Sequence, residues 1–145
     1  MSSRKPTLCL DFDGVIHRYS KGWHDGTAYD EPVNGALDAI RRFMDAGHPV
    51  FILSTRRPSQ IEAWIGKHAP DISTSIISSV NDDAPFWNRA GVLGITRLKL
   101  AAELYVDDRG YRFTGDWTTP YDPQEGDFGV PCNEWAVREL INSGK

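Results

Sequence analysis

The chain has 145 residues, of which 40% are hydrophobic and 25% charged, and its formal net charge is -4. This length suits one domain with one core, and the acidic balance argues against a protein that coats nucleic acid electrostatically. Two distant cysteines, Cys9 and Cys132, indicate neither a disulfide framework nor a zinc site. No apolar run reaches membrane-spanning length and the start lacks the apolar region of a signal peptide, so we expect a soluble cytoplasmic protein without membrane partners.

The first half of the chain predicts strands and helices in alternation. Residues 7–12 (TLCLDF) are a continuously apolar run, which indicates a short strand buried on both faces. Residues 14–32 show no periodicity and predict a loop, and a helix follows over 32–46, opened by its proline. Residues 49–54 (PVFILS) predict a second buried strand, and residues 58–70 predict a second helix.

The second half continues this alternation less regularly. Strands are expected over 71–79, 103–108 and 111–113, and helices over 83–90 and 133–141. Strands that alternate with helices are typical of a parallel sheet with helices on both faces. The sequence therefore predicts an α/β fold, a three-layer α/β/α Rossmann-like domain with a central parallel sheet, spanning residues 1–145 as a single domain.

Polar side chains stand where three of the predicted strands end. They are Asp11 with Asp13, Ser54 with Thr55, and Asp107 with Asp108. Because the carboxyl ends of parallel strands meet at one edge of the sheet, where ligands bind, we expect these side chains to lie together.

The residue types at this edge indicate phosphoryl chemistry. Converging carboxylates repel one another unless a cation neutralises them, and oxygen ligands without His or Cys favour Mg²⁺, which normally also holds a phosphate. One carboxylate can then form an aspartyl-phosphate, and another, two residues on, can act as general acid and base. A hydroxyl such as that of Ser54 can bond the phosphoryl oxygens, and Lys99 can neutralise the developing charge.

The same residues resemble the motifs of the haloacid dehalogenase superfamily of aspartate-dependent phosphatases. DFDGV at 11–15 resembles the first motif and FILST at 51–55 the second. Lys99 resembles the third motif and LYVDDRG at 104–110 the fourth. The resemblance covers nearly the whole chain, with the motifs in the family's order.

The resemblance implies a role for each matched residue. It makes Asp11 the nucleophile and Asp13 the acid and base, while Ser54 and Lys99 hold the transferring phosphoryl group. It implies Mg²⁺ bound by a set of four residues, namely Asp11, the backbone carbonyl of Asp13, Asp107, and Asp108 directly or through water. Two assignments stay open: Thr55 is a second hydroxyl beside Ser54, and Arg97 is an alternative cation to Lys99.

The spacing of the first two motifs leaves no room for a cap domain. Only about forty residues separate Asp13 from Ser54, so residues 16–31 are expected to form a short flap over the site. The capless form and the Asp-Asp-Arg ending are similar to the phosphatase part of polynucleotide kinase-phosphatases. The resemblance therefore implies phosphorylated substrates, with nucleotides or polynucleotide ends ranked first.

Four residues are candidates for binding that substrate: Thr55, Arg56 and Arg109, which follow strand ends, and Trp23, which lies in the expected flap. Two other functions remain open on the sequence. One is a non-catalytic module that binds Mg²⁺ and a phosphorylated partner, which the presence of Asp13 disfavours. The other is phosphoryl transfer to an acceptor other than water.

Overall fold

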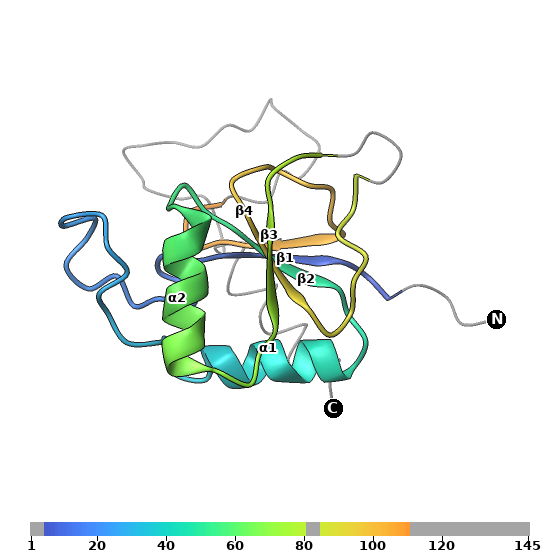
Figure 1. The fold of residues 1–145 in the computed structure, drawn as a ribbon, viewed down its shortest axis with the longest axis horizontal. Coiled ribbons are helices and arrows are strands. Elements are labelled where there is room, and N and C mark those ends of the chain that lie inside the picture. Colours follow the sequence, from blue (N-terminus) through green and yellow to red (C-terminus); the bar gives the residue numbers. More distant parts are fainter. Residues whose placement is uncertain (1–4, 81–84, 111–145) are drawn as a thin grey trace, which may run out of the picture.

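The described part of the chain forms one parallel sheet with two helices. The computed structural model describes residues 5–80 and 85–110. Within them a five-stranded sheet lies beside the helices (Figure 1). The elements are β1 (Leu8–Asp11), α1 (Ala36–Asp45), β2 (Val50–Leu53), α2 (Pro58–His68), β3 (Thr74–Ile77), β4 (Leu93–Thr96) and β5 (Leu104–Val106). The predicted α/β class with a parallel sheet is confirmed.

The strand order is β3-β4-β2-β1-β5, and every pairing is parallel. From β1 the chain proceeds to β2 on one side, whereas β5 adds on the other side, so β1 lies at the point where the order reverses. In open α/β sheets ligands bind outside the carboxyl ends of the strands at such a point. Leu10 of β1 is in register with Val106 of β5, which places the residues that follow these two strands next to each other.

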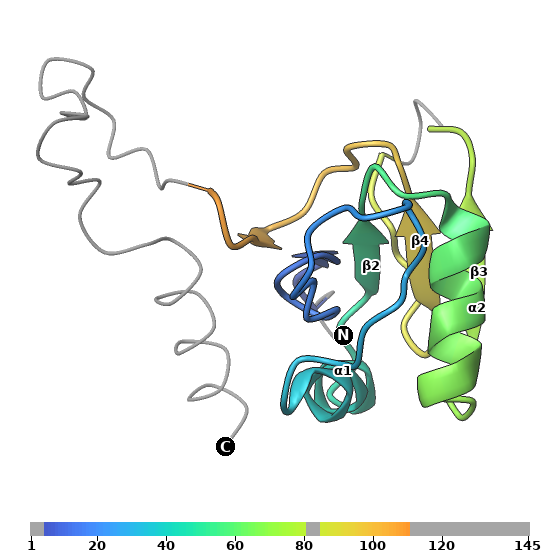
Figure 2. The same cartoon turned by 90° about the vertical axis from the view of Figure 1, so that its left-hand side faces the viewer.

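The two faces of the sheet are covered differently. The face that carries Leu10 and Ile52 packs against both helices, through residues such as Ile40 of α1 and Ile61 of α2. Figure 2 shows α2 running alongside β3 and β4. The opposite face, with Cys9 and Phe51, packs against a segment without helices, through Trp87, Leu98 and Leu100. Within residues 5–80 and 85–110, the helices therefore lie on one face only.

The first helix begins later than predicted. It starts at Ala36, because the residues from Pro32 on are bonded to the flap. Pro32 pairs with His17 as an isolated antiparallel bridge, and the N–H of Val33 donates to the carbonyl of Ile16 at 2.7 Å. Pro32 therefore follows the end of the flap and is bonded to it, and the helix begins only at Ala36.

The strand β4 was not predicted from the sequence. It is four residues long and contains Gly94, which weakens a strand pattern. A Cβ atom at Gly94 would lie 2.8 Å from Ile77 Cδ1 and 3.0 Å from both Phe51 and Trp87. The glycine is required because neighbouring side chains cross directly over the strand.

The helix predicted over 83–90 is wrong for its described residues, since 85–90 are not helical. Their carbonyls are bonded elsewhere: that of Pro85 accepts the N–H of Ala101 at 3.1 Å, and that of Trp87 accepts the hydroxyl of Thr7 at 3.0 Å. These long-range bonds replace the bonds four residues along that a helix would need.

Two predicted elements, the strand over 111–113 and the helix over 133–141, lie outside the described residues. Of the helices that the structure describes, neither has the length and apolar character needed to cross a membrane.

Candidate active site

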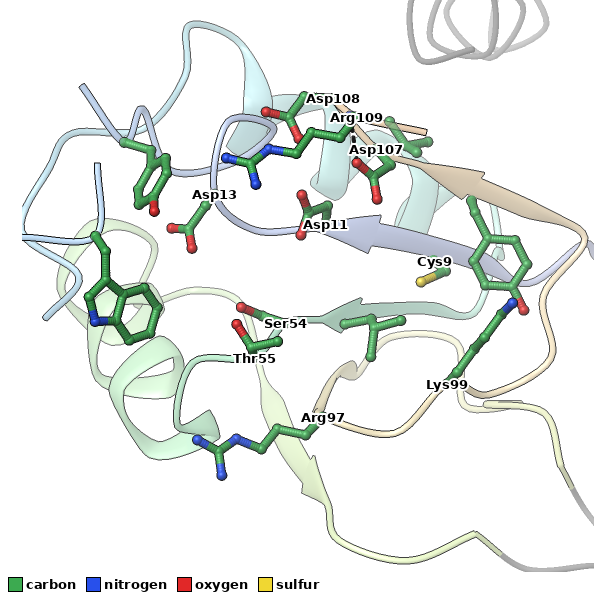
Figure 3. A pocket seen from close by; sticks show the side chains of 15 residues that line it. Cys9, Asp11, Asp13, Ser54, Thr55, Arg97, Lys99, Asp107, Asp108 and Arg109 are labelled. Carbon is green, nitrogen blue, oxygen red and sulfur yellow. Dashed lines mark hydrogen bonds between the residues drawn. The ribbon is translucent and has the colours of Figure 1, made fainter. Parts of the chain in front are cut away.

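A cleft of about 450 Å³ opens at the carboxyl ends of β1, β2 and β5. Figure 3 shows the side chains around it, with the four aspartates at one side and Ser54 and Thr55 facing them. Of the eleven predicted site residues, ten line this cleft: Asp11, Asp13, Trp23, Ser54, Thr55, Arg97, Lys99, Asp107, Asp108 and Arg109. The eleventh, Arg56, lies behind it.

Three carboxylates meet at the centre of the cleft. Asp11 is the last residue of β1, and Asp107 and Asp108 directly follow β5. One oxygen of each lies within 4.8 Å of the others. The pairing of β1 with β5 produces this cluster, because the register of the two strands places their carboxyl ends side by side.

Burial of these charges changes the acidity of Asp11. Its pKa is raised from the ordinary value of 3.8 to about 7, first by burial and next by the charge of Asp107, against a lowering by the N–H of Phe12. Cys9 lies beneath the cluster, and burial followed by the charge of Asp11 raises the pKa of its thiol to about 12. Since that thiol stays protonated, the cluster offers only oxygen ligands, a set that fits Mg²⁺.

Asp13 lines the same cleft, but its side chain belongs to a different set of contacts. Its Oδ1 accepts a bond from Nδ1 of His17 at 2.9 Å, and both of its oxygens lie 2.9 Å from Nε of Arg56. Figure 3 shows the Asp13 carboxylate on the side of the cleft away from Asp107. The side chain is thus separate from the group of three carboxylates, and metal binding by its backbone carbonyl stays a prediction.

The two candidate hydroxyls of the second strand differ in surroundings. Ser54 directly follows β2 and is 8% exposed, with its Oγ accepting the N–H of Arg56 at 3.1 Å. Thr55 is exposed at the cleft. Ser54 has the more fixed position, because its N–H also donates to the carbonyl of Thr96 at 3.1 Å.

Two cations follow the end of β4 and also line the cleft. Lys99 is exposed, and its Nζ lies 5.5 Å from the centre of the Tyr105 ring, at the end of the cleft beside Cys9 (Figure 3). Arg97 is exposed as well, and its Nε donates to the carbonyl of Arg56 at 3.3 Å. Both side chains therefore place a positive charge at the wall of the cleft.

Arg56, predicted to bind substrate, is only 1% exposed and does not line the cleft. Its guanidinium is used within the protein, where Nε contacts Asp13 and Nη1 donates to the carbonyl of Gly26 at 2.6 Å. Nη2 is buried and has no hydrogen-bond partner among the described residues. Since it is enclosed, Arg56 supports Asp13 from behind the cleft.

Trp23 and Arg109 are placed where the sequence suggested. Trp23 is 48% exposed and lines the cleft, with one ring face 4.6 Å from the guanidinium carbon of Arg56. Arg109 is exposed at the cleft, and its N–H donates to Oδ1 of Asp107 at 2.7 Å.

His17 is a site residue that the sequence did not identify. It is fully buried behind the cleft and bonded to Asp13, and burial lowers its pKa from the ordinary value of 6.5. Its place in the flap and its spacing of four residues from Asp13 were the available signals, and neither shows that the ring is buried.

No family model, curated protein or solved structure matches this chain.

Proposed function

We propose that the protein is a Mg²⁺-dependent phosphomonoester hydrolase of the haloacid dehalogenase type, which acts through an aspartyl-phosphate on Asp11. One observation carries the proposal. Asp11 ends the strand at which the sheet order reverses, its carboxylate lies within 4.8 Å of Asp107 and Asp108, and Asp13 and Ser54 line the same cleft. The proposal includes the family's three-layer domain, of which the described residues form the sheet and one helical layer.

The proposed reaction has two halves, both on Asp11. In the first, an Asp11 oxygen attacks phosphorus, the bond to the leaving oxygen breaks, and Asp13 gives that oxygen its proton. In the second, Asp13 takes a proton from water, the water oxygen attacks phosphorus, and the bond to Asp11 breaks to release inorganic phosphate. Asp13 returns to its protonated form, so the protons balance over the cycle.

The acidic cluster fits the cation that such a reaction needs. Asp11, Asp107, Asp108 and the backbone carbonyl of Asp13 would hold Mg²⁺. When bound, it supplies positive charge that offsets the repulsion between Asp11 and the phosphoryl group. The pKa of about 7 at Asp11 supports this assignment, because it reflects buried negative charge that no side chain of the cluster balances.

The other cleft residues hold the phosphoryl group in the proposal. The Oγ of Ser54 is aimed at the same cleft as Asp11 (Figure 3) and can donate to a phosphoryl oxygen. Lys99 supplies positive charge to the developing transition state, by turning from the Tyr105 ring into the cleft.

The rim of the cleft supports nucleotide or polynucleotide phosphates as substrates. Trp23 presents an exposed ring fixed by Arg56, and a base can stack on such a ring. Three exposed cations also line the cleft and can contact further phosphates: Arg97, Lys99 and Arg109. An aromatic surface combined with dispersed cations is the chemistry that binds single-stranded nucleic acid ends.

The test is phosphate release from a panel of phosphomonoesters. The panel holds mononucleotides, oligonucleotides phosphorylated at the 3′ or the 5′ end, sugar phosphates and a phosphopeptide, each with Mg²⁺ and with EDTA. Asp11→Asn is the inactive variant, and Asp45→Asn, an exposed aspartate at the end of α1, is the matched control. We expect Mg²⁺-dependent release that Asp11→Asn abolishes and Asp45→Asn leaves unchanged.

Two other outcomes would contradict the proposal. Saturable binding of a phosphorylated ligand without release indicates the non-catalytic module. Transfer of the phosphoryl group to an added alcohol or nucleoside, with little free phosphate, indicates the phosphotransferase.

A further inference from the structure

Two buried donors from different parts of the chain fix the carboxylate of Asp13. Nδ1 of His17 and Nε of Arg56 lie 2.9 Å from it, and both donor side chains have 0% exposure, whereas Asp13 itself has 18%. A buried guanidinium needs a carboxylate partner, since leaving it unpaired is costly. The side chain of Asp13 therefore has one favoured orientation in the cleft.

The hydrogen bonds of His17 determine which nitrogen carries the proton. The backbone N–H of Asp30 points at Nε2 of His17 at 2.9 Å, and an N–H can only donate. Nε2 is therefore the acceptor, and in the neutral imidazole the proton is on Nδ1, which donates it to Asp13. His17 thus links the backbone of the flap to Asp13 through its two ring nitrogens.

The ring of His17 is also prevented from turning. It stacks on Phe12 with centroids 5.1 Å apart and an interplanar angle of 3°. Trp64 and Tyr29 pack edge-on against it at 5.9 and 5.2 Å. Because three aromatic neighbours enclose the imidazole, the direction of its Nδ1–H towards Asp13 is set by the core and the flap together.

Arg56 forms the second link between Asp13 and the flap. Its Nη1 donates to the carbonyl of Gly26 at 2.6 Å, and its guanidinium carbon lies 4.6 Å from the ring of Trp23. A Cβ atom at Gly26 would contact that ring at 3.3 Å, so the flap backbone approaches closely here. The same arginine holds Asp13 on one side and the tip of the flap on the other.

The two oxygens of Asp13 are not equivalent in this arrangement. Among the described residues, Oδ1 accepts bonds from both His17 and Arg56, whereas Oδ2 accepts a bond from Arg56 alone. Oδ2 is therefore the oxygen with a lone pair left for the proton that moves during the reaction.

We propose that His17 and Arg56 are positioning residues for the acid and base Asp13, and that through them its orientation depends on the folded flap 16–31. The role of Asp13 in this proposal rests on the proposed function. The contrary interpretation is that both residues only fill the core. The two interpretations differ in which reactions a substitution slows.

The two interpretations can be separated by comparing kcat/KM for substrates with different leaving groups. The alkoxide that leaves a nucleoside monophosphate needs a proton from Asp13, whereas p-nitrophenolate is a stable anion and leaves without one. The ratio kcat/KM reports the first half-reaction, in which that proton is transferred. A positioning defect therefore lowers kcat/KM for the nucleotide more than for p-nitrophenyl phosphate, whereas a general folding defect lowers both equally.

A pair of substitutions at His17 tests whether the hydrogen bond from its Nδ1 to Asp13 matters for activity. In His17→Asn the amide nitrogen takes the place of Nδ1, and in His17→Gln the amide takes the place of Nε2. We expect His17→Gln to lower kcat/KM for the nucleotide at least about tenfold more than for p-nitrophenyl phosphate, and His17→Asn to keep most of the nucleotide activity. Equal losses on both substrates in both variants would overturn the proposal.

Arg56→Lys is the corresponding change at the second link, with Arg57→Lys, at an exposed neighbouring arginine, as its matched control. Lysine keeps the charge but cannot contact Asp13 and Gly26 together. We expect the same selective loss for Arg56→Lys and none for Arg57→Lys.

A measurement without catalysis tests the link to the flap. Hydrogen exchange of backbone amides in Asp13→Ala is compared with wild type, using Ile52 of β2 as the internal reference. We expect faster exchange at Asp30 and Gly26 and no change at Ile52. Unchanged exchange in the flap contradicts the link even if wild type hydrolyses nothing, so failure of this proposal and failure of the proposed function are distinguishable.

Discussion

The backbone of Gly14 lies directly against the carboxylate of Asp108, so closely that a Cβ atom at Gly14 would overlap Oδ2 and Cγ of that residue. Gly14 also has φ of +82°, in the left-handed region. The turn that follows Asp13 thus needs glycine for two reasons, and the second connects the β1 turn to the acidic cluster. Side chains at this position would push Asp108 away from Asp11.

Gly14→Ala is expected to weaken metal binding beyond its cost in backbone strain. Gly35→Ala is the matched control, because Gly35 also has φ of +82° but nothing within 4 Å of its added Cβ atom. Both variants should lose about 1–2 kcal/mol of unfolding free energy from the left-handed backbone. Only Gly14→Ala should also need about tenfold more Mg²⁺, measured as the Mg²⁺ concentration that gives half-maximal thermal stabilisation. Equal Mg²⁺ requirements in the two variants would show that Asp108 does not take part in metal binding.

Without bound metal, the unfolding free energy of the protein should fall as the pH rises and Asp11 ionises. The pKa of Asp11 is raised from 3.8 to about 7 in the fold. Its contribution to the unfolding free energy is therefore fully present below about pH 4 and is lost as the pH rises through about 7. In EDTA, Asp11→Asn should melt about 3 °C or more above wild type at about pH 8, with the difference shrinking towards about pH 5.

Addition of Mg²⁺ should reverse that order. Wild type gains stability when the cation neutralises the cluster, whereas Asp11→Asn has lost a ligand and gains less. Thermal melts at about pH 8 with and without Mg²⁺ check this. A pH-independent difference between the two proteins, unaffected by Mg²⁺, would contradict the assignment of Asp11 to a buried acidic cluster.

The two cations after β4 can be distinguished by substitution. Lys99→Met is expected to lower kcat about a hundredfold, which is typical for loss of a group that stabilises transition-state charge. Arg97→Met should mainly raise KM, since Arg97 is partly occupied by its bond to the carbonyl of Arg56. Steady-state kinetics on the best substrate of the panel give both values. A larger loss of kcat in Arg97→Met would assign the third-motif role to Arg97.

Trp23 is expected to contribute to binding of substrates that carry a base. Trp23→Ala should raise KM for a nucleotide about tenfold, in line with the usual value of one base stacked on an aromatic ring. A sugar phosphate without a base should show little change, and Trp23→Phe should keep most of the effect. If KM rises equally for both substrates, the Trp23 ring does not stack a base. It then acts by covering Arg56, whose guanidinium carbon lies 4.6 Å from the ring centre.

The sequence located the strands that carry the site, and also α2 and β3, but it did not locate β4. The runs that became β1, β2 and β5 are short and apolar and end in polar residues, so their pattern was readable without tertiary information. β4 was missed because Gly94 reads as a break until the side chains that cross it are known. The helix over 83–90 was overpredicted because the bonds that hold residues 85–90 come from Thr7 and Ala101, which no local pattern reveals.

The α/β class, the parallel sheet and the set of polar residues at the strand ends could all be predicted from the chain alone, because they follow from local hydrophobic pattern and from the order of the elements. Which of those polar residues lie close together depends on strand pairing and burial, which no local pattern reveals. The register of β1 with β5 brought Asp11 to Asp107 and Asp108, while burial of Arg56 removed it from the cleft. The hydrogen bonds that connect the flap to Asp13 through His17 could not be predicted from the sequence either. Their direction and the burial of His17 depend on neighbours that are distant in the chain.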